Sequence, residues 1–508
     1  MSTVATAHDA HAHAPHRVLI TLSVMLASIM QALDNTIANV ALPRIQGSLS
    51  ATQDQMAWVL TSYIIAAAIM TPLSGWLAGQ VGRKRVFLFS VVGFTVASAL
   101  CGLAQTLPEI VAARLLQGLC GAALIPMSQA VLLDINPPED HAKAMAIWVM
   151  AVTIGPILGP ALGGWLTEHY NWRWVFYINV PFGILSFLGI LSFMPETQIR
   201  KSRFDFFGFA ALSVAIGSLQ LMLDRGQLKD WFNSPEIRVE AIVSGTAFYL
   251  FVVHMLTTTK PAFVSPALFK DRNFLTGNLF IFIVGVVLFA TLALLPPLLQ
   301  DLMNYPVVLT GLVTAPRGIG TLLAMIIVSR IMGKIDTRLI IATGFGLTAL
   351  SLWQMTGFYL QMDVAPVVWS GLAQGIGTGF VYVPLAAITF ATLSPRYRNE
   401  GTALFSLIRN LGSSIGISAV ETFLTRGTQT MHARLAEQVT PYGHALGPNA
   451  STPQGLAMLN HMVTEQAAMI AYNNDFMLMM ILTLCAVPLV MLLRSGRKQA
   501  TDEMVMVE

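Results

Sequence analysis

The chain has 508 residues, of which 55% are hydrophobic and 11% are charged, and its formal net charge is +3. Soluble domains carry about 25% charged residues, so this composition excludes an ordinary soluble enzyme and indicates an all-helical protein with many membrane spans. The small net charge gives no basis for binding nucleic acid, and three cysteines in apolar stretches argue against a disulfide framework or a metal site.

Fourteen apolar stretches are long enough to cross a bilayer, and they follow a polar tail, residues 1–17, that lacks a signal peptide. The predicted spans, in chain order, are 18–41, 54–79, 85–105, 109–133, 142–167, 174–194, 206–223, 238–257, 274–296, 308–332, 338–360, 366–391, 401–424 and 475–493. An even number of spans places both termini on one side, and most of the 29 lysines and arginines fall on that side. Because positive charge marks the cytoplasmic side, we expect the tails at residues 1–17 and 495–508 to be cytoplasmic.

The second half of the chain repeats polar and turn residues of the first. Gln117-Gly118 and Gln374-Gly375 recur at an offset of about 257 residues, and each pair is followed by a proline in the same span. We therefore predict two parallel six-helix bundles, an inserted helix pair between them and a long external loop in the second bundle. The expected boundaries are 18–200 for the N-terminal bundle, 201–260 for the inserted pair, 261–494 for the C-terminal bundle and 425–474 for the loop.

Ionisable side chains inside predicted spans are the candidates for proton coupling, since a charge at membrane depth is rarely kept without a function. Asp34 lies in the outer half of the first span, and Arg114 lies about one turn into the fourth, where it can face the bundle interior and tune Asp34. Glu421 is either a second protonatable group or an interfacial residue. Asp34 could also be an interfacial carboxylate, and Arg114 could extend its long side chain to the interface.

The stretch GPILGPALGG, from Gly155 to Gly164, combines small residues and prolines within the fifth span. Its glycines recur every four residues and so form one stripe of a helix, which lets a neighbouring helix approach closely. We predict a close-packed, bent seam between two moving helix bundles, although ordinary small-residue packing would give the same pattern. The residues of the predicted seam are Gly155, Pro156, Gly159, Pro160, Gly163 and Gly164.

The stretch GWLAGQVGRKR, from Gly75 to Arg85, predicts a tight turn followed by three adjacent cations at the inner membrane surface. These cations could determine topology alone, or they could form a cytoplasmic latch by pairing with a helix C-terminus or a carboxylate. The residues assigned to the latch are Gly75, Gly82, Arg83, Lys84 and Arg85. The chain has no phosphate-binding loop of the Walker A type, so it does not encode an ATP-driven pump.

These motifs resemble the major facilitator superfamily, and within it the fourteen-helix drug:proton antiporters of the EmrB/QacA type. LDNTIANVALP, from Leu33 to Pro43, is similar to that family's first-helix motif, and RLLQGLCGAA, from Arg114 to Ala123, to its helix 4 motif. GWLAGQVGRKR resembles the superfamily's loop signature, except that Gly79 stands in place of the usual aspartate. GPILGPALGG resembles the helix 5 motif of exporters, while Asn171–Pro181 and Leu223–Ile237 resemble EmrB-like permeases.

The resemblance implies a proton-driven exporter of lipophilic small molecules that works by alternating access, not an enzyme, with the proton motive force in place of a cofactor. It also implies a place in the bacterial inner membrane and two partners, an EmrA-like periplasmic adaptor and a TolC-like outer-membrane channel. A proton-coupled importer and a non-transporting sensor or scaffold are the alternatives. The candidate residues of the substrate cavity are Asn35, Asn39, Gln117, Gln129, Arg317, Gln374, Arg409 and Asn410.

Overall fold

The computed structural model describes residues 16–493 apart from 138–139, 197–198, 200–202, 260 and 440–451, and this part of the chain is helical. The tails predicted at 1–17 and 495–508 lie outside the described residues except for the last two positions of the first tail. The α-helices, in chain order, are α1 (Arg17–Leu49), α2 (Gln53–Val81), α3 (Arg83–Leu103), α4 (Leu107–Gly121), α5 (Leu124–Ile135), α6 (His141–His169), α7 (Trp174–Tyr177), α8 (Asn179–Phe193), α9 (Phe206–Gly226), α10 (Pro235–Thr257), α11 (Arg272–Pro297), α12 (Val307–Ile331), α13 (Thr337–Met355), α14 (Val364–Ala391), α15 (Arg398–Gln438) and α16 (Pro453–Leu489).

Twelve helical stretches in the described part of the chain are long and apolar enough to cross a membrane. This confirms an all-helical protein of many spans, whereas the sequence predicts fourteen spans. The two predicted spans that are not among the twelve correspond to α6 and α13. In α6, Lys143–Gly155 is an apolar stretch, and the side chains of its flanking residues Ala142 and Pro156 lie outside the described part.

The helices start and end where the sequence supplies caps and turns. Thr52 and Gln55 form a capping box at the start of α2, and Thr106 forms one at the start of α4. Gly82 joins α2 directly to α3 with a φ of 94°, a backbone conformation that favours glycine. The stretch GWLAGQVGRKR therefore ends one helix, turns at a single residue and starts the next helix at Arg83.

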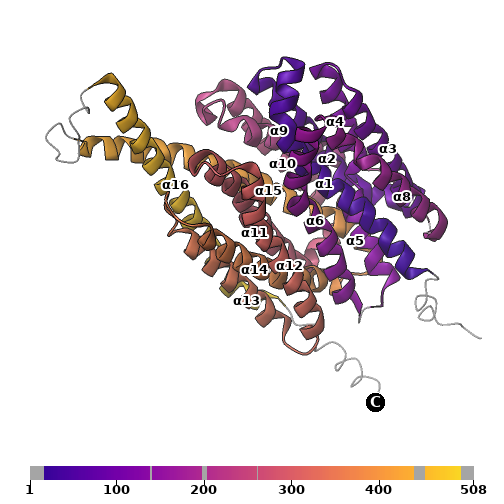
Figure 1. The fold of residues 1–508 in the computed structure, drawn as a ribbon. Helices are drawn as coiled ribbons and strands as arrows, with labels where there is room; N and C mark the ends of the chain where they lie inside the picture. The colour runs from indigo at the N-terminus through magenta and orange to yellow at the C-terminus, as the bar shows by residue number, and fades with distance from the viewer. Residues whose placement is uncertain are drawn as a thin grey trace, which may run out of the picture.

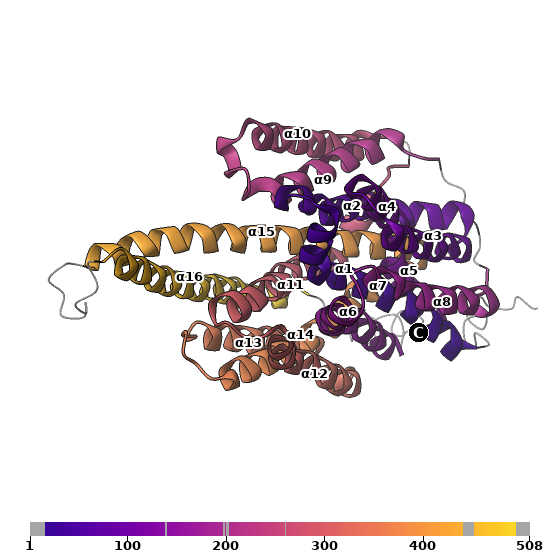
Figure 2. The same cartoon turned by 45° about the horizontal axis from the view of Figure 1, so that its top comes forward.

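The helices form two groups that pack against each other (Figures 1 and 2). Helices α1–α8 contact one another and form the N-terminal half, and helices α11–α16 form the C-terminal half. Between the halves, α15 contacts α2 and α5, and α6 contacts α12 and α14. Helices α9 and α10 pack together as a pair, and α9 contacts both α2 and α15, so the pair lies beside the junction of the halves.

Helices α15 and α16 extend beyond the other helices as a hairpin (Figures 1 and 2). His432 Nε2 lies 3.0 Å from Asn460 Oδ1, and Gly427 packs against Ala471, so the two extensions contact each other. The segment predicted as a long loop, 425–474, is therefore mostly helical, and its residues 440–451 lie outside the described part. Hydropathy marks where apolar residues stop, but a polar segment with few helix breakers continues as a helix.

Asp205 ties the start of α9 to α10 and to the segment that follows α10. Its carboxylate accepts hydrogen bonds from the amides of Gly208 and Phe263, both at 3.0 Å, and lies 2.9 Å from His254 Nε2. Burial by itself raises the pKa of Asp205, but the two amides and the imidazole outweigh it and hold the pKa below its ordinary value. This carboxylate therefore stabilises the fold in its charged form.

Replacing Asp205 with alanine is expected to lower the free energy of unfolding by about 1–2 kcal/mol at neutral pH, since a cap and an interhelical contact are lost together. A lowered pKa means that the stabilisation is complete above the ordinary carboxyl pKa and disappears as the pH falls through the lowered value. Thermal unfolding in detergent across a pH series measures both effects. A difference between variant and wild type that persists unchanged into strong acid would contradict this role.

Candidate functional site

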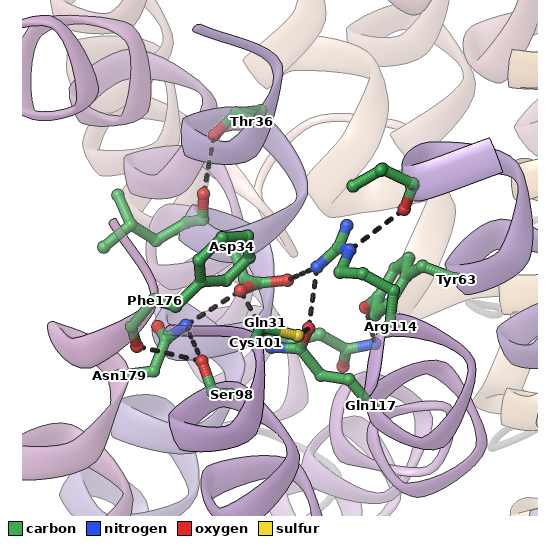
Figure 3. Close-up of polar contacts among 12 residues, drawn as sticks. Gln31, Asp34, Thr36, Tyr63, Ser98, Cys101, Arg114, Gln117, Phe176 and Asn179 are labelled. Atoms are coloured by element: carbon green, nitrogen blue, oxygen red, sulfur yellow. Dashed lines mark hydrogen bonds and ion pairs between the residues drawn. The ribbon is translucent and has the colours of Figure 1, made fainter. Parts of the chain in front are cut away.

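The side chain of Asp34 is fully buried in the N-terminal half and accepts three hydrogen bonds (Figure 3). Arg114 Nη1 donates to Asp34 Oδ2 at 2.6 Å, and the opposite carboxylate oxygen accepts from Gln117 Nε2 at 2.9 Å and from Asn179 Nδ2 at 2.8 Å. These donors come from α4 and α8, while Asp34 lies on α1. The structure thus brings together three helices around a single acid.

Arg114 is as buried as the acid that it pairs with, at 1% exposure. Its Nε donates to the carbonyl oxygen of Val59 at 3.2 Å, and Nη1 also donates to Gln117 Oε1 at 2.7 Å. The Tyr63 ring covers the guanidinium at 4.3 Å, and the Phe176 ring lies 5.8 Å from it. An aromatic face and two further acceptors offset part of the large cost of burying a cation.

Asn179 is the member of this cluster that the sequence analysis did not assign a role. It starts α8, and its Nδ2 donates both to Asp34 and to Ser98 Oγ, the latter at 2.9 Å, while Ser98 donates to the carbonyl oxygen of Phe176. The available signal was an amide between Ile178 and Val180 in an otherwise apolar stretch. A buried polar group in such a stretch needs a partner, and that partner is Asp34.

The contacts around Asp34 are those of a carboxylate, because each of the three neighbours donates and none accepts. A proton on this acid would remove an acceptor site and the charge that neutralises Arg114. The arrangement can therefore convert the gain or loss of a proton into a change in how tightly α1 is held to α4 and α8.

A second set of charges connects the two halves at the end of the molecule where α3 and α15 begin. Arg83 Nη1 lies 2.5 Å from Asp134 Oδ2, and Arg398 Nη1, in the other half, lies 2.8 Å from Asp134 Oδ1. Arg83 also donates to Asn399 Oδ1 at 2.6 Å. A Cβ on Gly75 would lie only 3.0 Å from the backbone of Glu400, so α2 approaches α15 closely here. The halves are thus clamped together at this end.

The clamp uses residues that the sequence analysis did not single out. Arg83 was among the candidates for a latch, but its partners Asp134 and Asn399 were not, and neither was Arg398, which also pairs with Asp134. These partners lie at helix ends, where charged residues are common, and only the fold shows that they face one another. Lys84 is half-buried, and Arg85 is exposed.

Residues 24–417 match the model of the Major Facilitator Superfamily. The chain is 37% identical over 483 residues to the fatty acid resistance protein FarB of Neisseria gonorrhoeae, covering 93% of this chain and 95% of that protein. It is also 37% identical over 470 residues to the multidrug export protein EmrB of Escherichia coli strain K12, covering 90% and 92%. The chain belongs to the major facilitator superfamily. Within the superfamily it is an EmrB-like permease.

The fold of this superfamily member also matches solved structures at low identity. The human organic anion transporter MFSD10 (TETRAN) aligns with a TM-score of 0.60 and 14% identity, over 92% of this chain and 100% of that one. The proton:xylose symporter XylE aligns with a TM-score of 0.59 and 14% identity, over 93% and 96%. At such identities the likeness establishes the superfamily fold alone.

The glycine stripe of α6 packs against α1, within the N-terminal half, whereas the sequence predicts a seam between the two halves. A Cβ on Gly155 would collide with the backbone of Ala32 and Leu33, and Gly159 faces Thr36 on the same helix, α1. Gly163 likewise faces α1. The side chains of two other predicted members, Pro156 and Pro160, lie outside the described residues, and Gly164 is half-buried. Small residues permit close approach, but their spacing does not identify the neighbour.

The stripe therefore holds α6 against the helix that carries Asp34, and enlarging it should be destabilising. Replacing Gly155 with alanine is expected to lower the free energy of unfolding by about 1–3 kcal/mol, because a backbone shift is needed to admit the methyl group. The matched control is Gly346→Ala on α13, where no atom lies within 4 Å of the added Cβ and helix propensity favours alanine. Thermal unfolding of both variants compares them, and equal effects would contradict the packing role.

The other predicted site residues do not join the Asp34 cluster. Glu421 is exposed on α15, and Asn35 and Asn39 are exposed on α1. Arg409 is buried and donates to Tyr382 Oη at 2.8 Å and to the neighbouring Asn410. The remaining three are buried, one in the N-terminal half and two in the C-terminal half, and they are Gln129, Arg317 and Gln374.

Proposed function

We propose that this permease is a proton-driven exporter of lipophilic small molecules that works by alternating access. The observation that carries the proposal is the Asp34–Arg114 pair, both members of which are at most 1% exposed inside a helical bundle. A buried acid that exchanges its proton on one side of the membrane at a time couples proton flow to the orientation of the two halves. The names of the relatives, multidrug export and fatty acid resistance proteins, support export as the direction.

Asp34 would alternate between two charge states during the cycle. When charged, it holds α1 to α4 and α8 through three donors, which is the arrangement described above. When protonated, it releases Arg114 and loosens that contact, which favours the opposite orientation. Inward movement of one proton down a potential of 100 mV supplies about 2.3 kcal/mol, enough for roughly a fiftyfold substrate gradient.

The clamp of Arg83, Asp134, Arg398 and Asn399 would act as the gate at the cytoplasmic end. Most lysines and arginines outside the predicted spans fall on the side of the membrane where the clamp lies. This distribution supports a cytoplasmic location for the clamp and for both termini. With the clamp closed, substrate could leave only toward the opposite face. We extend the proposal to fourteen spans, with α6 and α13 added to the twelve, and to the inner membrane of a bacterial cell.

We further propose that the hairpin of α15 and α16 is the docking element for a periplasmic adaptor, which would connect the permease to an outer-membrane channel. Its support is that the hairpin extends beyond the other helices (Figure 1). The hairpin contains the C-terminal end of α15, whereas the clamp residue Arg398 lies at the N-terminal end of the same helix. Its helices contact each other through His432 and Asn460, so they can present a formed surface. No cofactor is needed for this cycle, since the proton motive force supplies the energy.

Transport by the purified permease in proteoliposomes tests the function. An imposed pH gradient should drive a lipophilic dye against its concentration gradient, with protons moving in the opposite direction. Uptake in inverted vesicles but not in right-side-out vesicles would support export. Substrate and protons moving in the same direction would support the importer alternative, and a sensor or scaffold would give no substrate-dependent proton flux in either preparation.

A further inference from the structure

The two halves repeat one glutamine contact but differ in its partner. Gln117 Nε2 donates to Asp34 Oδ1 at 2.9 Å, and Gln374 Nε2 donates to Thr291 Oγ1 at 3.1 Å. The same offset of 257 residues relates Gln117 to Gln374 and Asp34 to Thr291. The C-terminal half therefore has a neutral hydroxyl at the position where the N-terminal half has its buried acid.

The C-terminal half nevertheless keeps a buried cation, which comes from a different helix. A Cβ on Gly118 would meet the carbonyl oxygen of Tyr63, and a Cβ on Gly375 would meet that of Arg317, so Arg317 on α12 occupies the repeat position of Tyr63 on α2. In the N-terminal half, the Tyr63 ring covers Arg114. In the C-terminal half, the arginine itself extends from this position.

Arg317 has no counter-ion among the described residues. Its side chain is buried at 7% exposure, Nη2 donates to the carbonyl oxygen of Leu288 at 3.2 Å, and Nη1 has no hydrogen-bond partner in the described part. Gly371 stands at the repeat position of Arg114 and supplies no charge there, and a Cβ on it would be in van der Waals contact with Arg317 Cβ at 3.7 Å. A buried guanidinium without an acid is strongly unfavourable, so a function is the better explanation for it.

A small cavity of about 20 Å³ lies within the C-terminal half, and its lining includes two neighbours of Arg317 but not Arg317 itself. Leu288, whose carbonyl oxygen accepts from Arg317, contributes to its wall, and so does Gln374, whose Oε1 has no hydrogen-bond partner among the described residues. The rest of the wall is mostly apolar, with three threonines, and consists of Val284, Val287, Phe345, Thr348, Thr378, Val381 and Thr483. A largely apolar cavity that is separated from an unpaired cation by Leu288 fits an amphiphile that carries one negative group.

We propose that Arg317 binds the carboxylate of an amphiphilic substrate, so that the substrate supplies the acid that the C-terminal half lacks. This inference rests on the proposed function and names the substrate class: apolar molecules with a carboxylate or a similar weakly acidic head group. A guanidinium binds a carboxylate through charge-assisted hydrogen bonds. The cavity admits only a water-sized group in the clamped state, so the head group reaches Arg317 only when the helices around it separate during the cycle.

The test compares dodecanoate with dodecanol, which share one apolar chain and differ in the head group. Binding is measured as thermal stabilisation of the full-length permease in phosphatidylcholine nanodiscs. The variants are Arg317→Gln, Arg317→Lys and the control Arg330→Gln, an exposed arginine on the same helix. We expect dodecanoate to bind Arg317→Gln about ten- to a hundredfold more weakly than wild type, Arg317→Lys to be intermediate and the control to be unchanged. Dodecanol should bind all four proteins alike.

Equal binding of dodecanoate by wild type and Arg317→Gln would overturn the proposal. Stabilisation by phosphatidylglycerol of wild type but not of Arg317→Gln would also overturn it, because Arg317 would then bind a membrane lipid. The unfolding temperature without ligand distinguishes a structural role of Arg317 from a binding role. Removing an unpaired charge should not lower the unfolding temperature of Arg317→Gln. A drop of several degrees in Arg317→Gln would therefore contradict a binding site. Failure of the wild type to use a pH gradient would contradict the proposed function without affecting this binding comparison.

Discussion

Replacing Asp34 with asparagine is expected to abolish the accumulation of substrate driven by a proton gradient. Asparagine keeps the size of the side chain and can accept from Gln117 and Asn179, but it carries no charge to pair with Arg114 and takes up no proton. The substrate gradient in proteoliposomes should fall from roughly fiftyfold at 100 mV to none, while substrate equilibrates downhill.

The control for this variant is Asp363→Asn, an exposed aspartate at the start of α14 that lies outside the cluster. Its accumulation ratio should equal that of wild type. Wild-type accumulation by Asp34→Asn would show that another group carries the proton. Arg114→Gln offers an internal check, because it leaves the acid in place and removes its counter-ion, so it should impair coupling by a different route.

Replacing Asp134 with alanine is expected to open the clamp between the halves. The variant removes the carboxylate shared by Arg83 and Arg398, so a charge link between α5 and α15 is lost. Asp134 is one-third exposed, and the loss is therefore about 1–2 kcal/mol, which shifts the ratio of clamped to open molecules by roughly five- to thirtyfold. Spin labels are placed at the exposed positions Arg85 and Arg396, one in each half. Double electron–electron resonance should report a longer distance between the labels in Asp134→Ala than in wild type.

Asp140→Ala is the matched control for the clamp. Asp140 pairs with Arg17 at 3.0 Å and with Lys143 at 3.5 Å, and both partners belong to the N-terminal half. Its removal should leave the distance between the labels unchanged. If Asp140→Ala lengthened that distance as much as Asp134→Ala, the effect would be a general loss of negative charge at this end and not the loss of a specific contact.

The sequence predicted the helical class, the buried acid and its arginine, because charges inside apolar stretches are visible without a structure. It identified GPILGPALGG as a packing motif but assigned it to the wrong pair of helices. Small residues reveal that a close approach exists, and only the fold shows that α1 is the neighbour. For the same reason Asn179 and Asp134 were missed, since their roles depend on partners that are distant in the chain.

The repeat was also more informative than its few matched residues suggested. The offset that pairs Gln117 with Gln374 brings Asp34 onto Thr291, but the sequence alone does not show that Arg317 replaces a tyrosine. Helix α12 is related to α2 by a different offset from the one that relates α14 to α4, because the connecting segments differ in length. Side-chain contacts across the helices were needed to align the two halves.

Proton release on substrate binding tests the central claim most directly. In a weakly buffered detergent solution, adding substrate to the purified wild-type permease should acidify the medium, because substrate and proton favour opposite orientations of the halves. Asp34→Asn should bind substrate and release no proton. Proton release by Asp34→Asn equal to that of wild type would contradict the assignment of Asp34 as the acid that couples the two flows.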